Sequence, residues 1–472
     1  MIRRILVGLG YAFVTAFVIV LTFVLVAYGN DYTYDFQTRQ IVQKGHVIIE
    51  SVPNGTNVTA DGKWLTKRTP YQAVWSVGQH TFTLTRDGYW PWTKLLEVLP
   101  GQVSLVNYAI LVPKSPARAV LDTRPSFAAE AISKDHRHMA YIDAGAAAAL
   151  YSLDLGGSAK PVKLYSPKAA ATEAPAEVLE SVTWSDDASH LLLRSKIGSA
   201  VTYRLLSAGG ASDSIDLTET YKFDFSGLVF SSNTWKQLYW LSPDGLRRLD
   251  VDSRSVSAVL AEKVTQFWVA NDRVLYVQQN DLGRSLWSLD RGGKHQRLID
   301  SLVLSDSYAL AYSSLQGQDE LALVPSSTRV GTLYFGILGD NPTAKVVAHD
   351  VITADFSPDG KVVAFSSPTQ IVTYDLDRYR LTGKSAIATI SDQPGKLQQL
   401  TWFDNAHLLT IRDGRLYWSE YDGANRLDLG PAGNLPAQHS SDFKSIYVTQ
   451  PVTATDSTSA ATQELVSVTV RP

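Results

Sequence analysis

Aromatic side chains gather in one short stretch of the chain, where they could bind a sugar. Tyr89, Trp90 and Trp92 stand almost together, and Trp64 and Trp75 precede them. Exposed aromatic rings stack on the apolar faces of sugar rings, so Tyr89, Trp90 and Trp92 are candidate ligand-binding residues for a cell-wall glycan. The alternative is structural, because a small domain needs large side chains to fill its core.

Motifs for other chemistry are missing or incomplete. The chain has no Gly-x-Ser-x-Gly elbow, no His-Glu-x-x-His pair and no dinucleotide fingerprint. The Gly-Lys-Ser run at 383–385 resembles the end of a phosphate loop, but Arg378 replaces the required glycine. His136 and His138 could share a strand face and hold a metal, yet they flank an expected turn without an identifiable third ligand. We therefore expect no catalytic, cofactor-binding or metal-binding residues, and we expect that the protein is not an enzyme.

A phrase of about 40 residues recurs along the last three quarters of the chain. It is clearest at 354–365, Ala-Asp-Phe-Ser-Pro-Asp-Gly-Lys-Val-Val-Ala-Phe, followed by a third apolar run at 371–377. Short runs rich in Val, Leu, Tyr, Trp and Phe, bounded by Gly, Asp, Asn and Ser, are typical of β-strands. The pattern predicts repeated sheets with few helices.

The copies can be aligned by their first turns, and they begin near residues 131, 182, 229, 267, 309, 354, 400 and 439. A four-stranded unit cannot bury both of its faces, and radial packing of several units solves this problem. We predict an all-β propeller over residues 117–472 with eight blades, or seven if the weak fifth copy is an insertion. The last copy offers three strands, so Ala117–Thr123 is expected to complete its blade and to join the two ends of the ring.

The first turn of the sixth copy identifies a family resemblance. Ser357-Pro358-Asp359-Gly360-Lys361 is similar to the turn of WD40-like repeats in TolB-type propellers. Other copies read Ser-Lys-Asp, Ser-Asp-Asp or Phe-Asp-Asn, and the Gly-His and Trp-Asp marks of ordinary WD40 blades are absent. A second Ser-Pro-Asp-Gly run, at 242–245, follows the second strand of its copy and is expected to be a different turn. The resemblance implies a fold and not an activity.

The N-terminus predicts a membrane anchor. Residues 5–27 form an uncharged apolar run, long enough to cross a hydrocarbon core of about 30 Å. Arg3 and Arg4 precede the run, so the positive-inside rule places the tail 1–4 in the cytoplasm and the bulk of the chain outside the cell membrane. Residues 28–44 are expected to be a juxtamembrane linker. The alternative to an anchor is a cleaved signal peptide, although signal cores are usually shorter.

Small residues recur every four positions in this run, at Gly8, Ala12 and Ala16. Such a stripe lets two membrane helices approach closely, so weak self-association is one expectation. The other interpretation is that small residues are common in any anchor.

A second domain is predicted between anchor and propeller, at 45–113. It contains alternating strand residues, a Pro-Asn-Gly-Thr turn at 53–56, an Asp-Gly hairpin at 61–62, Thr-Pro at 69–70 and a Gly-Tyr corner at 88–89. This order resembles the PEGA domain, a small β-sandwich-like module of prokaryotic surface proteins, although Asn and Thr replace the Glu and final Ala of the family's tetrapeptide. The resemblance implies a surface-associated module for binding or spacing.

Composition agrees with an exported protein that does not bind nucleic acid. The 472 residues contain no Cys, which excludes disulfides and thiolate sites, and no Cys can carry a lipid anchor. The formal net charge is −3, and no basic stripe stands out.

Three function classes remain. The favoured one is a membrane-anchored scaffold that binds a protein or cell-envelope partner through its propeller. The second is an enzyme such as a glycan lyase or hydrolase, whose site would lie in the propeller's central channel. The third is a structural spacer of the cell envelope without a saturable ligand.

Overall fold

The computed structural model describes residues 2–35, 39–145, 148–157, 160–167, 175–315, 317–337, 343–376, 386–391, 395–452 and 462–471. These residues divide into two compact units. Unit 1 comprises Met1–Pro116 with Val470–Pro472, and unit 2 comprises Ala117–Thr469.

Unit 1 begins with the helix α1 (Ile2–Gly29). Its segment Gly8–Gly29 is long and apolar enough to cross a membrane, and none of the segment is buried. At about 1.5 Å per residue the segment is about 33 Å long. A signal sequence near the N-terminus can also be long and apolar, so the helix by itself is compatible with an anchor or a signal peptide.

A hairpin follows the helix directly, within the region that we expected to be a linker. Asp31 ends the helix in the left-handed conformation, with φ 61°. The strands β1 (Tyr32–Asp35) and β2 (Gln40–Gln43) then pair antiparallel.

The rest of unit 1 is a sandwich of two sheets. One sheet has the order β6-β3-β9 and the other β5-β4-β7-β8. Side chains alternate between the buried and the outer face along β3, which is the pattern of a strand with one face in a core. Val47, Phe82, Trp92 and Val106, from both sheets, are at most 2% exposed and belong to one apolar cluster. The strands are β3 (Gly45–Val52), β4 (Asn57–Ala60), β5 (Lys63–Arg68), β6 (Tyr71–Trp75), β7 (Gly78–Thr85), β8 (Trp92–Val98) and β9 (Val103–Ile110).

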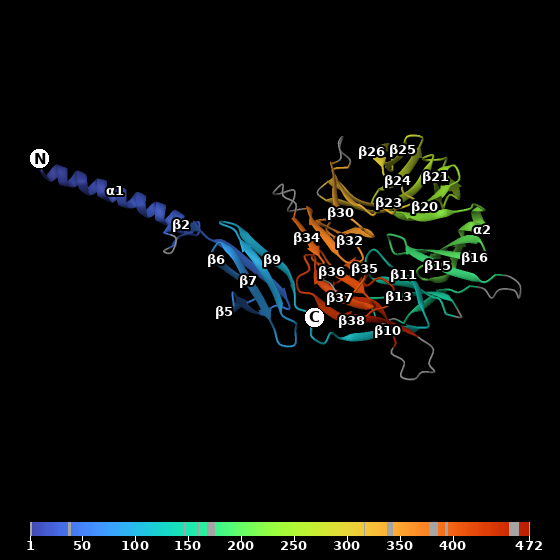
Figure 1. The fold of residues 1–472 in the computed structure, drawn as a ribbon, viewed down its shortest axis with the longest axis horizontal. Coiled ribbons are helices and arrows are strands. Elements are labelled where there is room, and N and C mark those ends of the chain that lie inside the picture. Colours follow the sequence, from blue (N-terminus) through green and yellow to red (C-terminus); the bar gives the residue numbers. More distant parts are fainter. Residues whose placement is uncertain are drawn as a thin grey trace. The chain divides into compact units, whose positions relative to one another are not determined.

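Unit 2 consists of eight four-stranded antiparallel sheets within its described residues. Seven of them contain four strands that are consecutive in the chain. The eighth sheet has the order β10-β41-β40-β39, so the first strand of the unit is the outer strand of the last sheet. Figure 1 shows β10 (Arg118–Arg124), in teal, among the red C-terminal strands.

The sheets are numbered here in chain order. The first contains β11 (Phe127–Ile132), β12 (His138–Asp143), β13 (Ala149–Asp154) and β14 (Val162–Tyr165). The second contains β15 (Glu177–Trp184), β16 (His190–Ile197), β17 (Ala200–Ser207) and β18 (Gly210–Asp216), and it is followed by the short helix α2 (Leu217–Tyr221). The third contains β19 (Ser226–Ser231), β20 (Thr234–Ser242), β21 (Gly245–Asp250) and β22 (Ser255–Val256). The fourth contains β23 (Val264–Ala270), β24 (Arg273–Asn280), β25 (Gly283–Leu289) and β26 (His295–Leu302).

The remaining sheets follow the same plan. The fifth contains β27 (Tyr308–Leu315), β28 (Gln318–Pro325), β29 (Gly331–Phe335) and β30 (Thr343–Ala348). The sixth contains β31 (Thr353–Phe356), β32 (Val362–Ser366), β33 (Ile371–Asp375) and β34 (Ala386–Ile390). The seventh contains β35 (Leu397–Trp402), β36 (His407–Arg412), β37 (Arg415–Glu420) and β38 (Leu427–Pro431). The eighth contains β10, β39 (Gln438–His439), β40 (Ser445–Pro451) and β41 (Gln463–Thr469).

The recurring Ser-x-Asp sequence forms the same turn in four sheets. In the sixth sheet the Ser357 hydroxyl donates to Asp359, 2.8 Å away, and accepts from the backbone N–H of Val362 at 3.0 Å. Gly360 follows the Asp in the left-handed conformation, with φ 71°. The same pattern recurs with other residues in the left-handed position: Ser133-Asp135-His136, Ser185-Asp187-Ala188 and Ser440-Asp442-Phe443. The serine and aspartate hold this turn together even where the glycine is lost, which explains why they are the part of the repeat that persists.

Consecutive sheets of unit 2 pack face to face. Shared apolar clusters join the first and second sheets, the second and third, and so on to the sixth and seventh. Another cluster joins the eighth sheet to the first. Phe403 lies between the seventh and eighth sheets, with its ring centroid 6.0 Å from those of His439 and Phe443. The core of unit 2 is therefore a succession of layers between sheets.

Candidate functional site

The structure separates the three aromatic residues that the sequence singled out. Trp92 is 1% exposed in the sandwich core. Tyr89 is half-buried against that core, with the Arg86 guanidinium carbon 5.7 Å from its ring centroid. Trp90 is 43% exposed, and Lys114 Nζ lies 5.9 Å from its ring centroid. Of the three predicted residues, Trp90 is the one with an accessible ring.

The two histidines considered as metal ligands point to different neighbours. The ring of His136 stacks on that of His439, with centroids 3.8 Å apart, whereas His138 lies 5.9 Å from Trp184. The described residues contain no group of three or more His, Cys, Asp or Glu side chains that could hold a metal ion. Arg378 and the run 383–385 lie outside the described residues.

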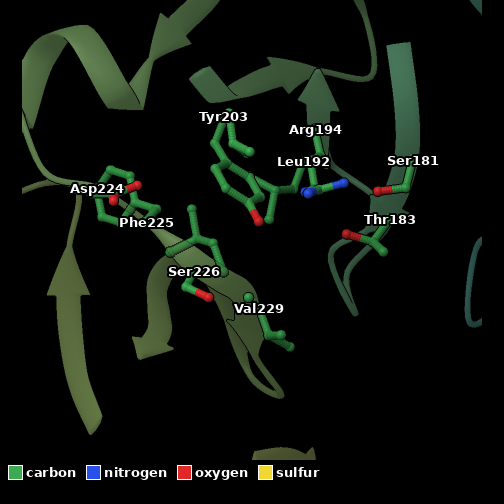
Figure 2. A pocket seen from close by; sticks show the side chains of 12 residues that line it. Ser181, Thr183, Leu192, Arg194, Tyr203, Asp224, Phe225, Ser226 and Val229 are labelled. Carbon is green, nitrogen blue, oxygen red and sulfur yellow. The ribbon is translucent and has the colours of Figure 1, made fainter. Parts of the chain in front are cut away.

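A cavity of about 560 Å³ lies between the second and third sheets. Strands β15, β16 and β17 form one wall, and the segment that leads into β19 forms the other. Figure 2 shows the Tyr203 hydroxyl pointing into the cavity, between Asp224 on one side and Arg194 on the other. The lining residues are Ser181, Thr183, Leu192, Arg194, Val201, Tyr203 and Asp224–Val229.

Local sequence explains how this cavity is built. The ring of Phe225 meets those of Tyr203 and Trp240 edge to face, with centroids 6.3 and 5.3 Å away, so Phe225 fixes the segment before β19 onto the core. The pairing of β19 with β20 then shifts between Ser226 and Val229. Gly227 occupies this bulge with φ 65°, a conformation that side chains disfavour. The bulge redirects β19 beside the cavity.

The polar groups of the cavity differ in whether they have an ion-pair or hydrogen-bond partner in the protein. Arg194 forms an ion pair with Glu180 on the neighbouring strand. Asp224 is exposed, and it makes no hydrogen bond or ion pair within the part of the chain that the structure describes. Hydroxyl groups of Ser181, Thr183 and Ser226 also line the cavity. The site therefore offers one carboxylate and several hydroxyls to a ligand.

A smaller cavity of about 230 Å³ adjoins this one. Both are lined by Thr183, Leu228 and Val229, and the smaller one extends to Lys134 and Asp186. Lys134 Nζ lies 2.6 Å from the Asp186 carboxylate. The two cavities together form a polar groove along β15 and β19.

A third cavity, of about 440 Å³, contains charged groups that are already paired. Arg204 Nη2 lies 2.7 Å from Asp216, and the Tyr165 hydroxyl donates to Glu177 at 2.7 Å. Burial, together with the hydrogen bond to Glu177, raises the pKa of Tyr165. This network stabilises the outer strands of the first and second sheets, and it leaves little charge for a ligand.

Two carboxylates on the first strands of their sheets have raised pKa values. Burial raises the pKa of Glu130 on β11 to about 8, although Gln438 Nε2 donates to it at 3.2 Å. Burial raises the pKa of Asp355 on β31 to about 6. Neither residue lines the three cavities described above.

Sequence reasoning missed Arg194, Tyr203 and Asp224, because they belong to two copies of the repeat and meet only across the joint. The one local signal was Gly227, a glycine within an otherwise apolar strand, which is typical of a bulge.

Comparisons with known proteins support the two-unit description. Residues 44–111 match the family model described as PEGA domain, which confirms the sequence prediction for this part of the chain. No curated protein matches the chain. Unit 2 has the strand order of a β-propeller, with four consecutive antiparallel strands in seven of its described sheets and the first strand of the unit in the eighth.

Several solved structures are similar to this chain at low identity. The structure described as the Dos1 propeller has a TM-score of 0.49 at 12% identity, over 75% of this chain and 95% of that chain. Saccharomyces cerevisiae Sqt1 has a TM-score of 0.45 at 12% identity, over 76% and 98%. The complex of KlAtg21 with the coiled coil of AgAtg16 has a TM-score of 0.44 at 10% identity, over 64% and 94%.

Proposed function

We propose that the protein is a membrane-anchored, extracytoplasmic binding protein that presents a propeller to a protein or cell-envelope partner. One observation carries the proposal: the wholly uncovered apolar segment Gly8–Gly29 is followed, after one hairpin, by a PEGA match and then by unit 2. An apolar helix of this length is stable in lipid, whereas in water it would expose a large apolar surface. Arg3 and Arg4 before the helix favour a cytoplasmic N-terminus.

In this proposal the eight sheets of unit 2 are the eight blades of a closed propeller of the TolB-type, WD40-like kind. Two observations support it. The first strand of the unit pairs with β41 in the last sheet, and every sheet packs on the next, including the eighth on the first. A closed ring leaves only short strand edges and presents a broad surface.

The groove between the second and third sheets is the proposed ligand position. Its carboxylate, Asp224, and its hydroxyls favour a partner group that carries positive charge and hydrogen-bond donors, such as a basic side chain or an amino sugar. A second contact, to a wall glycan, is proposed at the exposed ring of Trp90.

The anchor and the ligand position need separate experiments. Alkaline carbonate should leave the full-length chain in the membrane fraction, and an N-terminus that starts near Asn30 would overturn the anchor. Amino-sugar oligomers and basic peptides should bind the purified protein, and Asp224→Asn should weaken binding severalfold. Asp306→Asn, a change of another exposed carboxylate, is the matched control. Saturable binding that Asp224→Asn leaves unchanged would contradict this ligand position, and no saturable binding would favour a structural spacer.

A second candidate function is an enzyme with its site in the channel of the proposed propeller. The raised pKa values of Glu130 and Asp355 favour it, because a carboxyl that stays protonated near neutral pH can act as a general acid. Hydrolysis or lyase activity on wall glycans that Glu130→Gln or Asp355→Asn abolishes would support this function over a binding role.

A further inference from the structure

The hairpin that follows α1 has an unusual distribution of side chains. The register pairs Tyr32 with Gln43 and Tyr34 with Ile41, so these residues share one face. Tyr32 is 42% exposed, Tyr34 48% and Ile41 71%. A hairpin in water usually shows polar residues on its exposed face, but here the exposed face carries two tyrosines and an isoleucine.

The base of the hairpin is fastened to the end of the helix. Gln43 Nε2 donates to the carbonyl of Asn30 at 3.1 Å, and the Lys44 N–H donates to the carbonyl of Asp31 at 3.0 Å. His46 Nε2 lies 2.6 Å from the Asp31 carboxylate, at the start of the sandwich. Each strand has four residues, so its far end is about 13 Å from this fixed base. The face with Tyr32 therefore stays close to the end of α1.

The same junction is tied to the sandwich. The N–H of Gly101 donates to the carbonyl of Lys44 at 3.0 Å, and the N–H of His46 donates to the carbonyl of Gln102 at 2.9 Å. A side-chain carbon at Gly101 would lie 2.8 Å from the amide of Gln43, so the turn packs closely on the end of the hairpin. Helix end, hairpin and sandwich are thus joined without a free linker.

The chemistry of this face matches the headgroup layer of a bilayer. Tyrosine is enriched there because its ring is apolar and its hydroxyl is polar. A two-stranded hairpin has unpaired backbone groups along its outer edges, which excludes the hydrocarbon core but not the hydrated layer about 5–7 Å thick above it. An isolated hairpin is only marginally stable in water, so coverage of one face would stabilise it.

We infer that the face formed by Tyr32, Tyr34 and Ile41 lies on the lipid headgroups beside the end of α1. The inference rests on the proposed membrane anchor. This contact attaches the hairpin to the membrane surface at a second point beside α1. It therefore limits how far the sandwich can tilt relative to that surface.

The chain has no cysteine, so single cysteines can report on each position without removing others. Ile41→Cys places a label on the proposed lipid face, and Thr33→Cys places one on the opposite face of the same hairpin. Val20→Cys places a third within the helix. Each full-length variant is labelled with an environment-sensitive fluorophore and inserted into phosphatidylcholine vesicles. The vesicles contain spin labels either at the headgroup or midway along the acyl chain.

The expected result is that the headgroup spin label quenches the label at 41 several-fold more strongly than the label at 33. The acyl-chain spin label should quench the label at 20. Equal, weak quenching at 41 and 33 with strong quenching at 20 would overturn the inference and leave the anchor intact. The inference also fails if the label at 41 is shielded from aqueous iodide without lipid quenching, because a second copy would then cover the face. No quenching at 20 would refute the anchor, and the inference with it.

Discussion

Two joints between sheets of unit 2 differ in how their space is filled. At the eighth–first joint, Phe127, Tyr141 and Leu465 belong to one apolar cluster and are each 1% exposed, and the ring of His136 stacks on that of His439 across the joint. The second–third joint shares a core too, yet it leaves the cavity of about 560 Å³ that Tyr203 and Asp224 line.

Different pairs of rings bridge the two joints. The left-handed residue of the first turn is His136, and that of the eighth is Phe443; both stack on His439. At the second–third joint His190 stacks on Trp235, with ring centroids 3.7 Å apart, and the cavity opens beside the bulge of β19. Joints between copies of the same repeat thus differ in a few side chains, and one of them keeps an open cavity.

The largest expected effect concerns the packing of the eighth–first joint. Leu465→Ala removes a fully buried side chain and should lower the free energy of unfolding by about 2–5 kcal/mol. Val229→Ala, on the half-open wall of the cavity, should change it by no more than about 0.5 kcal/mol. Urea unfolding followed by tryptophan fluorescence gives both values, and equal losses would refute the contrast between the joints.

The next effect is the pH dependence of the same joint. Burial lowers the pKa of His439 to about 4, and it also lowers the pKa of His136. Between the usual histidine pKa of about 6.5 and pH 4 the unfolded chain therefore binds more protons, so stability should fall as the pH falls, by up to about 3 kcal/mol for His439. His439→Phe keeps the stacked ring and should flatten this part of the profile.

Other titratable groups near the joint change the stability in a different pH range or in the opposite direction. Burial acts to raise the pKa values of Asp135, Asp404 and Asp442, but it is outweighed by the charge of His407 at Asp404 and by hydrogen bonds at all three. The net pKa values are lowered, so these carboxylates lose their contribution to stability only at more acidic pH. The comparison of wild type with His439→Phe above pH 4 isolates the histidine. Parallel profiles of the two proteins would contradict the prediction.

Removal of one tyrosine hydroxyl should lower the free energy of unfolding by about 2 kcal/mol more at the eighth–first joint than at the second–third joint. The Tyr141 hydroxyl donates to the Asp122 carboxylate, so Tyr141→Phe removes a hydrogen bond to a charged group and should cost about 1.5–3 kcal/mol. The Tyr203 hydroxyl points into the cavity and makes no hydrogen bond within the described residues. Tyr203→Phe should therefore change stability by less than about 0.5 kcal/mol. Thermal unfolding of both variants measures the two losses of stability. Similar decreases in melting temperature would show that the Tyr203 hydroxyl contributes as much to stability as the Tyr141 hydroxyl.

The carboxyl of Glu130, beside Gln438, should give a pH dependence of the opposite sign. Its pKa is raised to about 8, so between about pH 4.5 and 8 the folded protein holds a proton that the unfolded chain has lost. Stability should fall as the pH rises through this range. Glu130→Gln keeps the oxygen that accepts from Gln438, and its gain in stability over wild type should be larger at pH 9 than at pH 5, by up to about 4 kcal/mol. A difference that does not change with pH would argue that Glu130 is ionised in the folded protein.

The sequence allowed the PEGA match and the repeated strands to be predicted because both depend on local patterns. Alternation in β3 and the Ser-x-Asp turns are visible within a dozen residues. The Ser-Pro-Asp-Gly run at 242–245 is a hairpin between β20 and β21, as its position after the second strand indicated.

The site was not predictable in the same way. Arg194 and Asp224 line one cavity only because two copies pack against each other, and nothing in either copy specifies the width of the joint. The aromatic residues were visible in the sequence, but their exposure was not. Trp92 fills the core of the sandwich, whereas Trp90 faces solvent. A sequence shows which residues could bind, but burial decides which of them are available.

The pairing of β10 with β41 has a consequence for how the chain is made. The two strands lie about 340 residues apart, and β10 is synthesised first. At bacterial to eukaryotic translation speeds, β10 waits about 20–70 s for its partner. During this time the outer position of the last sheet cannot be filled, and the edge of β10 is open to other strands. The strand β10 can therefore reach its final place only after almost the whole of unit 2 has been synthesised.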